Sequence, residues 1–293
     1  MNIFGKIIGF FLGYLFLGPI GAVIGVLVGG IFDRGLHINL YQMPRERALE
    51  VQRAFFTSTF SVMGHLAKAD GRVSENEIRA ARKIMSQFEL NEMMTQEAIH
   101  LFNAGKEPHF DLDAVLSNLL QACHKHSDLL RFFIEIQLEA ALADGKLQPE
   151  EQRILLHICK RLNFSPQEFD QLWARQWAGQ SFYQWYASQF EQNAYAEAGA
   201  KHAYGGYSYG HQQHAYTERR RDTSLQDAYG VLGIPESATI ADIKKAYRRL
   251  MNQHHPDKLA SRGLPGGMVK LAKEKTQQIR AAYDRIREAR GFK

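Results

Sequence analysis

Cysteine is scarce in this chain, and its scarcity excludes two kinds of small protein. Only Cys123 and Cys159 occur among 293 residues. Two thiols cannot make a disulfide scaffold, nor can they supply the four ligands of a thiolate zinc site. We therefore expect both cysteines to be reduced interior residues of a protein that faces the cytosol.

The sequence also lacks the motifs that would indicate an enzyme. No glycine-rich phosphate loop follows a strand, and the histidines between residues 45 and 178 show no metal-ligand spacing such as His-Glu-x-x-His. Few segments alternate polar and apolar residues with the period of two that strands need. We predict an all-α protein that is not an enzyme, with no cofactor and no bound metal.

Basic and acidic side chains are unevenly distributed along the chain. The net charge is +5, and residues 226–293 carry 14 basic and 7 acidic side chains. Residues 40–178 carry 16 basic and 19 acidic side chains, so the middle of the chain is slightly acidic. An acidic partner should therefore bind the last 68 residues.

The first segment contains a long run without charge. Ile7–Phe32 spans 26 uncharged residues, and roughly 20 apolar residues are enough for a helix to cross the hydrocarbon core of a bilayer. The alternative is a cleaved signal peptide, whose apolar region is usually only about 7–15 residues long. We predict an uncleaved transmembrane helix at residues 7–32, preceded by a short segment at residues 1–6. More arginines follow the run than precede it, which indicates a periplasmic amino terminus and a cytoplasmic bulk.

Glycines are regularly spaced within the predicted transmembrane helix. Gly21, Gly25 and Gly29 recur at intervals of four and place a smooth stripe on one helix face. Such a stripe lets a second helix approach closely, which predicts a homodimer through the membrane. The alternative is that these glycines are merely tolerated in lipid, where glycine is frequent.

Residues 45–178 have helical periodicity almost throughout. One predicted apolar stripe runs from Val51 to Leu66, and another includes Phe133, Ile136, Ala140 and Ala143. The turn Ala-Lys-Ala-Asp-Gly at residues 67–71 resembles the turn Ala-Leu-Ala-Asp-Gly at residues 141–145. We expect each to close a helix at a left-handed glycine, giving two similar helical halves.

The two Asp-Gly turns are similar to half of a calcium loop. The first and third ligand positions hold no oxygen ligand, so an EF-hand is excluded. A weaker alternative is a cation held between Asp70, Glu77, Asp144 and Glu151; helix capping explains the same residues. The turns resemble those of TerB-like domains, which implies a helical regulatory or interaction domain and names no substrate.

Residues 179–224 are rich in Gln, Tyr, Gly and His. The first residues of this segment can extend a preceding helix, but the composition as a whole cannot bury a core. We predict a flexible linker between the helical domain and the last domain at residues 225–293.

The last domain shows three helical segments. A short helix over residues 227–232 should close at Gly233, and Thr239 with Asp242 should cap a second helix. Ile240, Ile243, Tyr247, Leu250 and Met251 are predicted to face inward. The opposite face is basic and carries Lys244, Lys245, Arg248 and Arg249.

The tripeptide His255-Pro256-Asp257 follows this basic helix, which cannot continue through the proline. A third helix after a loop would pair antiparallel with the second. Together with Asp-Ala-Tyr-Gly-Val-Leu-Gly-Ile at residues 227–234, these features resemble the J-domain of DnaJ-type co-chaperones. The resemblance implies that a DnaK-type chaperone binds the basic face and the tripeptide, and that its ATP hydrolysis is stimulated.

The order of the three parts resembles that of membrane-anchored bacterial co-chaperones with a J-domain. This resemblance implies a regulatory co-chaperone at the inner membrane, linked to envelope or capsule signalling. The alternative is a membrane-anchored regulatory protein whose basic domain binds nucleic acid or whose TerB-like domain senses a cation. A single basic face and the tripeptide favour the chaperone partner, so we expect no nucleic acid to bind.

Overall fold

The structure is a computed structural model, and it describes residues 45–69, 71, 82, 85–142, 147–199 and 224–292, with side chains up to residue 186 in the long helix that ends at Gly199. The chain divides into two units, residues 1–43 and 44–293, and every described residue belongs to the second. The predicted transmembrane helix lies outside the described residues. Within the described ranges, no helix is both long and apolar enough to cross a membrane.

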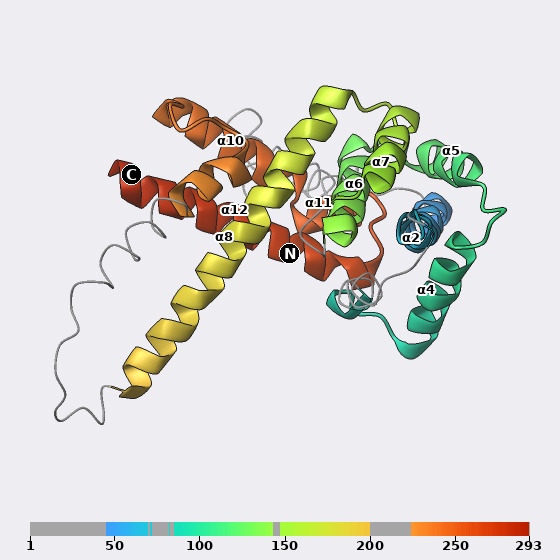
Figure 1. Cartoon of the computed structure of the whole chain (residues 1–293), viewed down its shortest axis with the longest axis horizontal. Coiled ribbons are helices and arrows are strands. Elements are labelled where there is room, and N and C mark those ends of the chain that lie inside the picture. Colours follow the sequence, from blue (N-terminus) through green and yellow to red (C-terminus); the bar gives the residue numbers. More distant parts are fainter. Residues whose placement is uncertain are drawn as a thin grey trace, which may run out of the picture. The chain divides into compact units, whose positions relative to one another are not determined.

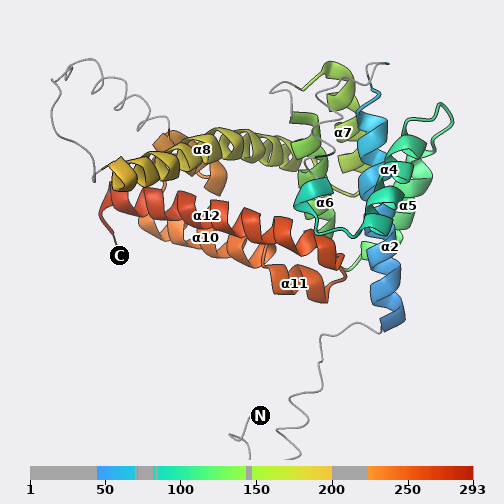
Figure 2. The same ribbon diagram turned by 90° about the horizontal axis from the view of Figure 1, so that it is seen from below.

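The described residues are helical, and strands are absent from them, as the missing period-two alternation predicts. Figures 1 and 2 show how the helices are arranged. Their bounds are α2 Arg45–Leu66, α4 Glu92–Gly105, α5 Leu112–Cys123, α6 Ser127–Ala141, α7 Pro149–Arg161, α8 Pro166–Gly199, α10 Ile240–Gln253, α11 Pro256–Ser261, the 3-10 turn η2 Gly266–Met268 and α12 Val269–Arg290.

Helix α2 is the centre of a helical bundle formed with α4–α7 and the first half of α8. It contacts α4, α5 and α6, which explains why its apolar stripe is buried. All six predicted stripe residues, from Val51 to Leu66, are buried, and Phe55 packs edge-on against Phe133 of α6 with 6.1 Å between ring centroids. Phe133 and Ile136 are buried as predicted, and both cysteines are buried and free.

Two glycines allow α2 and α4 to pack closely. A Cβ atom at Gly64 would overlap the carbonyl oxygen of Phe102, and one at Gly105 would overlap the carbonyl oxygen of Ser61. Both obstacles are backbone atoms, which cannot move aside as a flexible side chain would. The two helices therefore depend on glycine at each position.

The Asp-Gly turns are only partly described. Gly71 has the positive φ of 86° that the predicted helix ending requires. In the second turn, Pro149 occupies the first turn of α7, and Gln148 and Glu151 form a reciprocal cap. Asp70, Glu77 and Asp144 lie outside the described residues, so neither the predicted capping role nor the alternative of a cation between them is tested.

Helix α8 continues well past residue 178, where we predicted the linker to begin. It runs to Gly199, and Phe182 within it is buried in an apolar cluster with Ala228 and Leu232. The continuation has a physical reason, because Phe182 and its neighbours pack against a domain that is distant in sequence. Composition alone gives no indication of that surface.

Residues 224–292 form an antiparallel pair, α10 and α12, with α11 and η2 in the connection between them. Ile243 and Leu250 of α10 are buried in one cluster with Ile279 and Ile286 of α12, as predicted. Tyr247 stacks on Tyr283 with 4.2 Å between ring centroids. The inward prediction for Ile240 was wrong, because this first residue of α10 is 44% exposed.

The close packing of α2 and α4 gives a test of the bundle. Gly105→Ala should lower the free energy of unfolding by about 1–3 kcal/mol, the usual cost of overpacking. Gly179→Ala in α8 is the matched control, since a Cβ there meets nothing within 4 Å. Helix propensity should make that control neutral or stabilising by up to about 1 kcal/mol. Equal changes in the free energy of unfolding for the two substitutions, measured by urea denaturation, would contradict the close contact of α2 with α4.

Candidate functional site

The candidate site begins with the cap that positions α10. Thr239 accepts the backbone N–H of Asp242 at 3.2 Å, and the Asp242 carboxylate accepts the backbone N–H of Thr239 at 3.3 Å. This reciprocal cap confirms the predicted start of the helix. Gly233, with φ of 64°, closes the preceding helical stretch as predicted.

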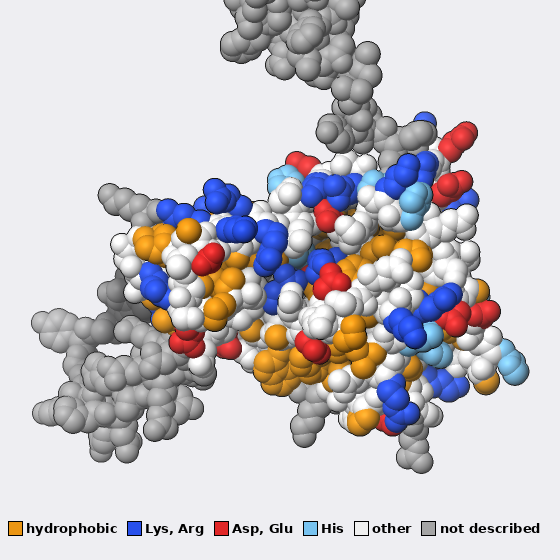
Figure 3. All heavy atoms as spheres, turned by 90° about the horizontal axis from the view of Figure 1, so that it is seen from above, with side chains coloured by type: hydrophobic (Ala, Val, Ile, Leu, Met, Phe, Trp, Pro, Cys, Tyr) orange, Lys and Arg blue, Asp and Glu red, His pale blue; other side chains and the backbone are white. Residues whose placement is uncertain are grey.

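The four predicted basic residues of α10 lie away from the apolar cluster. Lys245, Arg248 and Arg249 are exposed, and none of the three forms a salt bridge with a described carboxylate. Lys244 is half-buried, with its ammonium 5.5 Å from the centroid of the Phe292 ring. Figure 3 shows Lys and Arg side chains gathered in a band over the end of the molecule that carries α10.

The tripeptide lies at the junction of α10 and α11. His255 precedes α11, and Pro256 takes the first helical position. The fixed φ of proline suits a helix there, and a backbone N–H at that position would have no partner within the helix. The side chains of His255 and Asp257 are exposed. The predicted loop is therefore partly helical, and the tripeptide lies at the start of α11.

Sequence reasoning missed His254, the residue just before the tripeptide. It is buried, its Nε2 lies 2.7 Å from the Glu135 carboxylate, and its Nδ1 lies 3.0 Å from the Leu250 carbonyl oxygen. Both ring nitrogens therefore face an oxygen that accepts hydrogen bonds. The residue type of His254 alone gives no signal for a partner that lies 119 positions away in the chain.

Glu135 lies at the centre of this buried charge cluster. Burial alone would raise the pKa of its carboxyl group, but the charges of His254, Arg175 and Lys275 together with the His254 hydrogen bond lower that pKa to about 2. Arg175 of α8 donates to Glu135 at 3.3 Å. The carboxylate is thus kept ionised in the interior by groups from α8, from α12 and from the α10–α11 junction.

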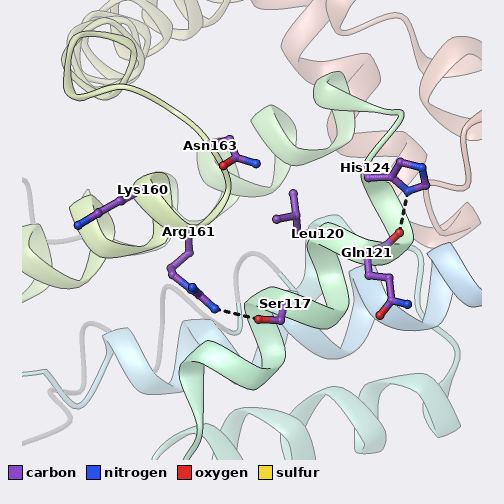
Figure 4. A pocket seen from close by; sticks show the side chains of 7 residues that line it. All are labelled: Ser117, Leu120, Gln121, His124, Lys160, Arg161 and Asn163. Atoms are coloured by element: carbon purple, nitrogen blue, oxygen red, sulfur yellow. Dashed lines mark hydrogen bonds between the residues drawn. The ribbon is translucent and has the colours of Figure 1, made fainter.

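A shallow pocket elsewhere in the bundle offers no clear chemistry. It lies between α5 and the end of α7 and is shown in Figure 4. Arg161 on its wall donates to Ser117 at 2.9 Å and pairs with Asp113, so its charge is already compensated. Within the described ranges, no group of three or more His, Cys, Asp or Glu side chains could hold a metal ion.

Comparison with family models defines the class of the C-terminal domain. Residues 227–290 match the DnaJ domain, residues 57–174 match the tellurite resistance protein TerB, and residues 1–39 match the co-chaperone DjlA transmembrane domain. The helical pair with an exposed His-Pro-Asp turn is therefore a J-domain, and the bundle is TerB-like.

Full-length relatives then identify the family. The chain is 44% identical to the co-chaperone protein DjlA of Coxiella burnetii over 100% of both chains. It is 39% identical to the protein of that name from Haemophilus influenzae over 100% of both, and 40% identical to that from Photobacterium profundum over 99% of both. The chain belongs to the DjlA family of co-chaperones. No solved structure matches it.

The Glu135 cluster predicts a pH dependence of stability. The folded-state pKa of about 2 lies below the ordinary 4.5, so the unfolded chain binds the proton more readily. The stabilisation is complete above about pH 4.5 and is lost as the pH falls towards 2, amounting to about 1–3 kcal/mol. Denaturant titrations at several pH values should therefore show the difference between the parent and Glu135→Gln shrinking in acid.

The control for this experiment is Glu150→Gln on α7, where the carboxylate pairs with Arg153 at the surface. Surface pairs contribute little, so this variant should follow the parent at every pH. A difference between parent and Glu135→Gln that stays constant from pH 7 to pH 3 would contradict the ionised, buried Glu135.

Proposed function

We propose that the chain stimulates ATP hydrolysis by a DnaK-type chaperone and does so from the inner membrane, with the J-domain in the cytoplasm. The observation that carries the proposal is the exposed His255-Pro256-Asp257 turn at the end of the basic face of α10. Membership of the DjlA co-chaperone family supports the partner, and the match of residues 1–39 supports the membrane anchor.

The geometry suggests separate roles for the basic face and the tripeptide. Lys244, Lys245, Arg248 and Arg249 would attract an acidic surface of the chaperone and accelerate the encounter. Asp257 is exposed on a turn fixed by Pro256, so its carboxylate can accept charge-assisted hydrogen bonds from an arginine of the partner. Docking would then depend on side chains of α10, and triggering on the turn that follows it.

The predicted trigger can be tested with Asp257→Asn in the full chain. This substitution keeps the size of the side chain and removes its charge, so stimulation of single-turnover ATP hydrolysis should be lost while the helical content is unchanged. Asp284→Asn on α12 is the matched control and should stimulate as the parent does. Full stimulation by a folded Asp257→Asn variant would refute the assigned role of the tripeptide.

The predicted docking face can be tested by charge reversal. Arg248→Glu with Arg249→Glu should slow association by about tenfold or more at low salt, and the effect should shrink as salt screens the charges. Arg280→Glu with Arg287→Glu makes the same charge change on α12 and should have a smaller effect. Equal effects of the two pairs would show that only net charge matters, and binding to nucleic acid in a mobility assay would favour the alternative partner.

The anchor itself stays a prediction, because Gly21, Gly25 and Gly29 lie outside the described residues. Replacing all three by leucine should weaken cross-linking of the full chain in membranes if the stripe packs helix on helix. A carboxy-terminal alkaline phosphatase fusion should be inactive, since that enzyme needs the periplasm. High phosphatase activity would reverse the orientation and remove the cytosolic chaperone from reach.

A further inference from the structure

Helix α6 carries a row of carboxylates on the side that meets the J-domain. Asp128, Glu135 and Glu139 are spaced by seven and four residues, which places them on one face of the helix. We call these three residues the acidic ridge. Each of them contacts the J-domain through at least one cationic side chain.

The contacts of the acidic ridge are short and specific. Asp128 pairs with Lys258 at 2.9 Å and also accepts a hydrogen bond from Arg262. Glu139 pairs with Lys275 at 2.9 Å, and the side chain of Gln176 bridges the two. Glu135 also pairs with the buried His254. The ridge therefore contacts α12 through Lys275, and it contacts the residues on either side of the tripeptide, His254 and Lys258.

Apolar and backbone contacts continue this interface on either side of the ridge. Gly230 packs so closely against Ala178 of α8 that a Cβ atom on it would lie 2.5 Å from the Ala178 Cβ. The backbone N–H of Glu89 donates to the carbonyl oxygen of Gly267 at 2.8 Å. The J-domain is therefore docked along the TerB-like bundle and not merely attached by surface charges.

The ridge uses cations that the proposed chaperone contact does not. The ridge pairs with His254, Lys258, Arg262 and Lys275, whereas Lys245, Arg248 and Arg249 are exposed and form no salt bridge with it. The side chains of His255 and Asp257 also stay exposed in the docked arrangement. A chaperone can thus meet the basic face of α10 while the ridge is still bound.

A complete chaperone interface would nevertheless overlap the ridge. A stable protein interface buries about 800 Å² on each partner, which corresponds to a disc of roughly 16 Å radius. Lys258 is the residue directly after Asp257, and its ammonium lies 2.9 Å from Asp128. An interface of this size centred on the tripeptide would therefore cover Lys258 and the part of α6 that carries Asp128. A bound chaperone and α6 could not both occupy that surface.

We propose that the acidic ridge is an internal docking site for the J-domain and that a DnaK-type chaperone competes with it. The proposal rests on the proposed function, since the competitor is the chaperone that the tripeptide would engage. The TerB-like bundle then holds the J-domain in a state of lowered affinity. The apparent dissociation constant equals the intrinsic constant divided by the undocked fraction, and full stimulation is still reached at high concentrations of the chain.

The pair Glu139–Lys275 offers a test that leaves the proposed chaperone contacts intact. Glu139→Lys and Lys275→Glu each place like charges together and should favour the undocked state. Glu139→Lys with Lys275→Glu restores an opposite pair, and the Gln176 amide can reverse its donor and acceptor to match. All three variants are made in the full chain in detergent, and Glu150→Lys on α7 is the control for the charge change of Glu139→Lys.

The readout is the concentration of the full chain that gives half-maximal stimulation of ATP hydrolysis. Each single variant should lower this concentration by about threefold to tenfold at an unchanged maximal rate. The double variant and Glu150→Lys should return to the parent value. Helical content and thermal unfolding show whether each variant is folded, and the double variant separates a broken pair from a damaged fold.

Two results would overturn the inference in distinguishable ways. If the parent and the single variants stimulate at the same concentration, or the single variants need more protein, the ridge does not compete with the chaperone. If no variant stimulates at any concentration, the proposed function fails, and the competition fails with it. Recovery by the double variant is the result that a general loss of stability would not produce.

Discussion

A buried carboxylate cannot stay ionised unless cations surround it, and this constraint links the two described domains of the chain. Glu135 sits in α6 of the bundle, and its compensating groups come from α8, from α12 and from the end of α10. Breaking such a cluster by removing one partner is costly, because the remaining charge stays in a poorly solvated place. The position of the J-domain and the ionisation of Glu135 are therefore coupled.

That coupling places the predicted chaperone-binding residues of the J-domain next to the TerB-like bundle. The basic face and the tripeptide are exposed, while the residues on either side of the tripeptide are held by α6. One short turn thus connects an outward surface suited to a chaperone with an inward surface suited to the bundle. In the proposed competition, the TerB-like domain would regulate the J-domain through this inward surface.

The sequence predicted the local structure well, because local structure depends on neighbours. The Thr239 cap, the left-handed Gly233 and the buried stripe of α2 follow from spacing and residue type. Ile240 was misplaced because helical periodicity does not show where a helix leaves the core. The basic face and the tripeptide were also identified from sequence, although their contacts with a partner stay predictions.

Contacts distant in sequence could not be predicted in this way. His254 and Glu135 are separated by 119 positions, and neither residue carries a signal that names the other. The extension of α8 through Phe182 was allowed by the sequence, but the burial of Phe182 in the apolar cluster of the J-domain is not revealed by composition. Both features need the tertiary arrangement, and both lie at the interface between the two domains.

The most direct measurement is zero-length cross-linking of the full chain with a carbodiimide, which joins amines to carboxylates in contact. Lys275 and Glu139, 2.9 Å apart, should give a cross-linked peptide pair that mass spectrometry can quantify. Adding a DnaK-type chaperone with ATP should reduce this product, and it should do so far less when the chain carries Asp257→Asn. An unchanged yield in the presence of the bound chaperone would contradict the account, because the J-domain would then serve its partner without leaving the acidic ridge.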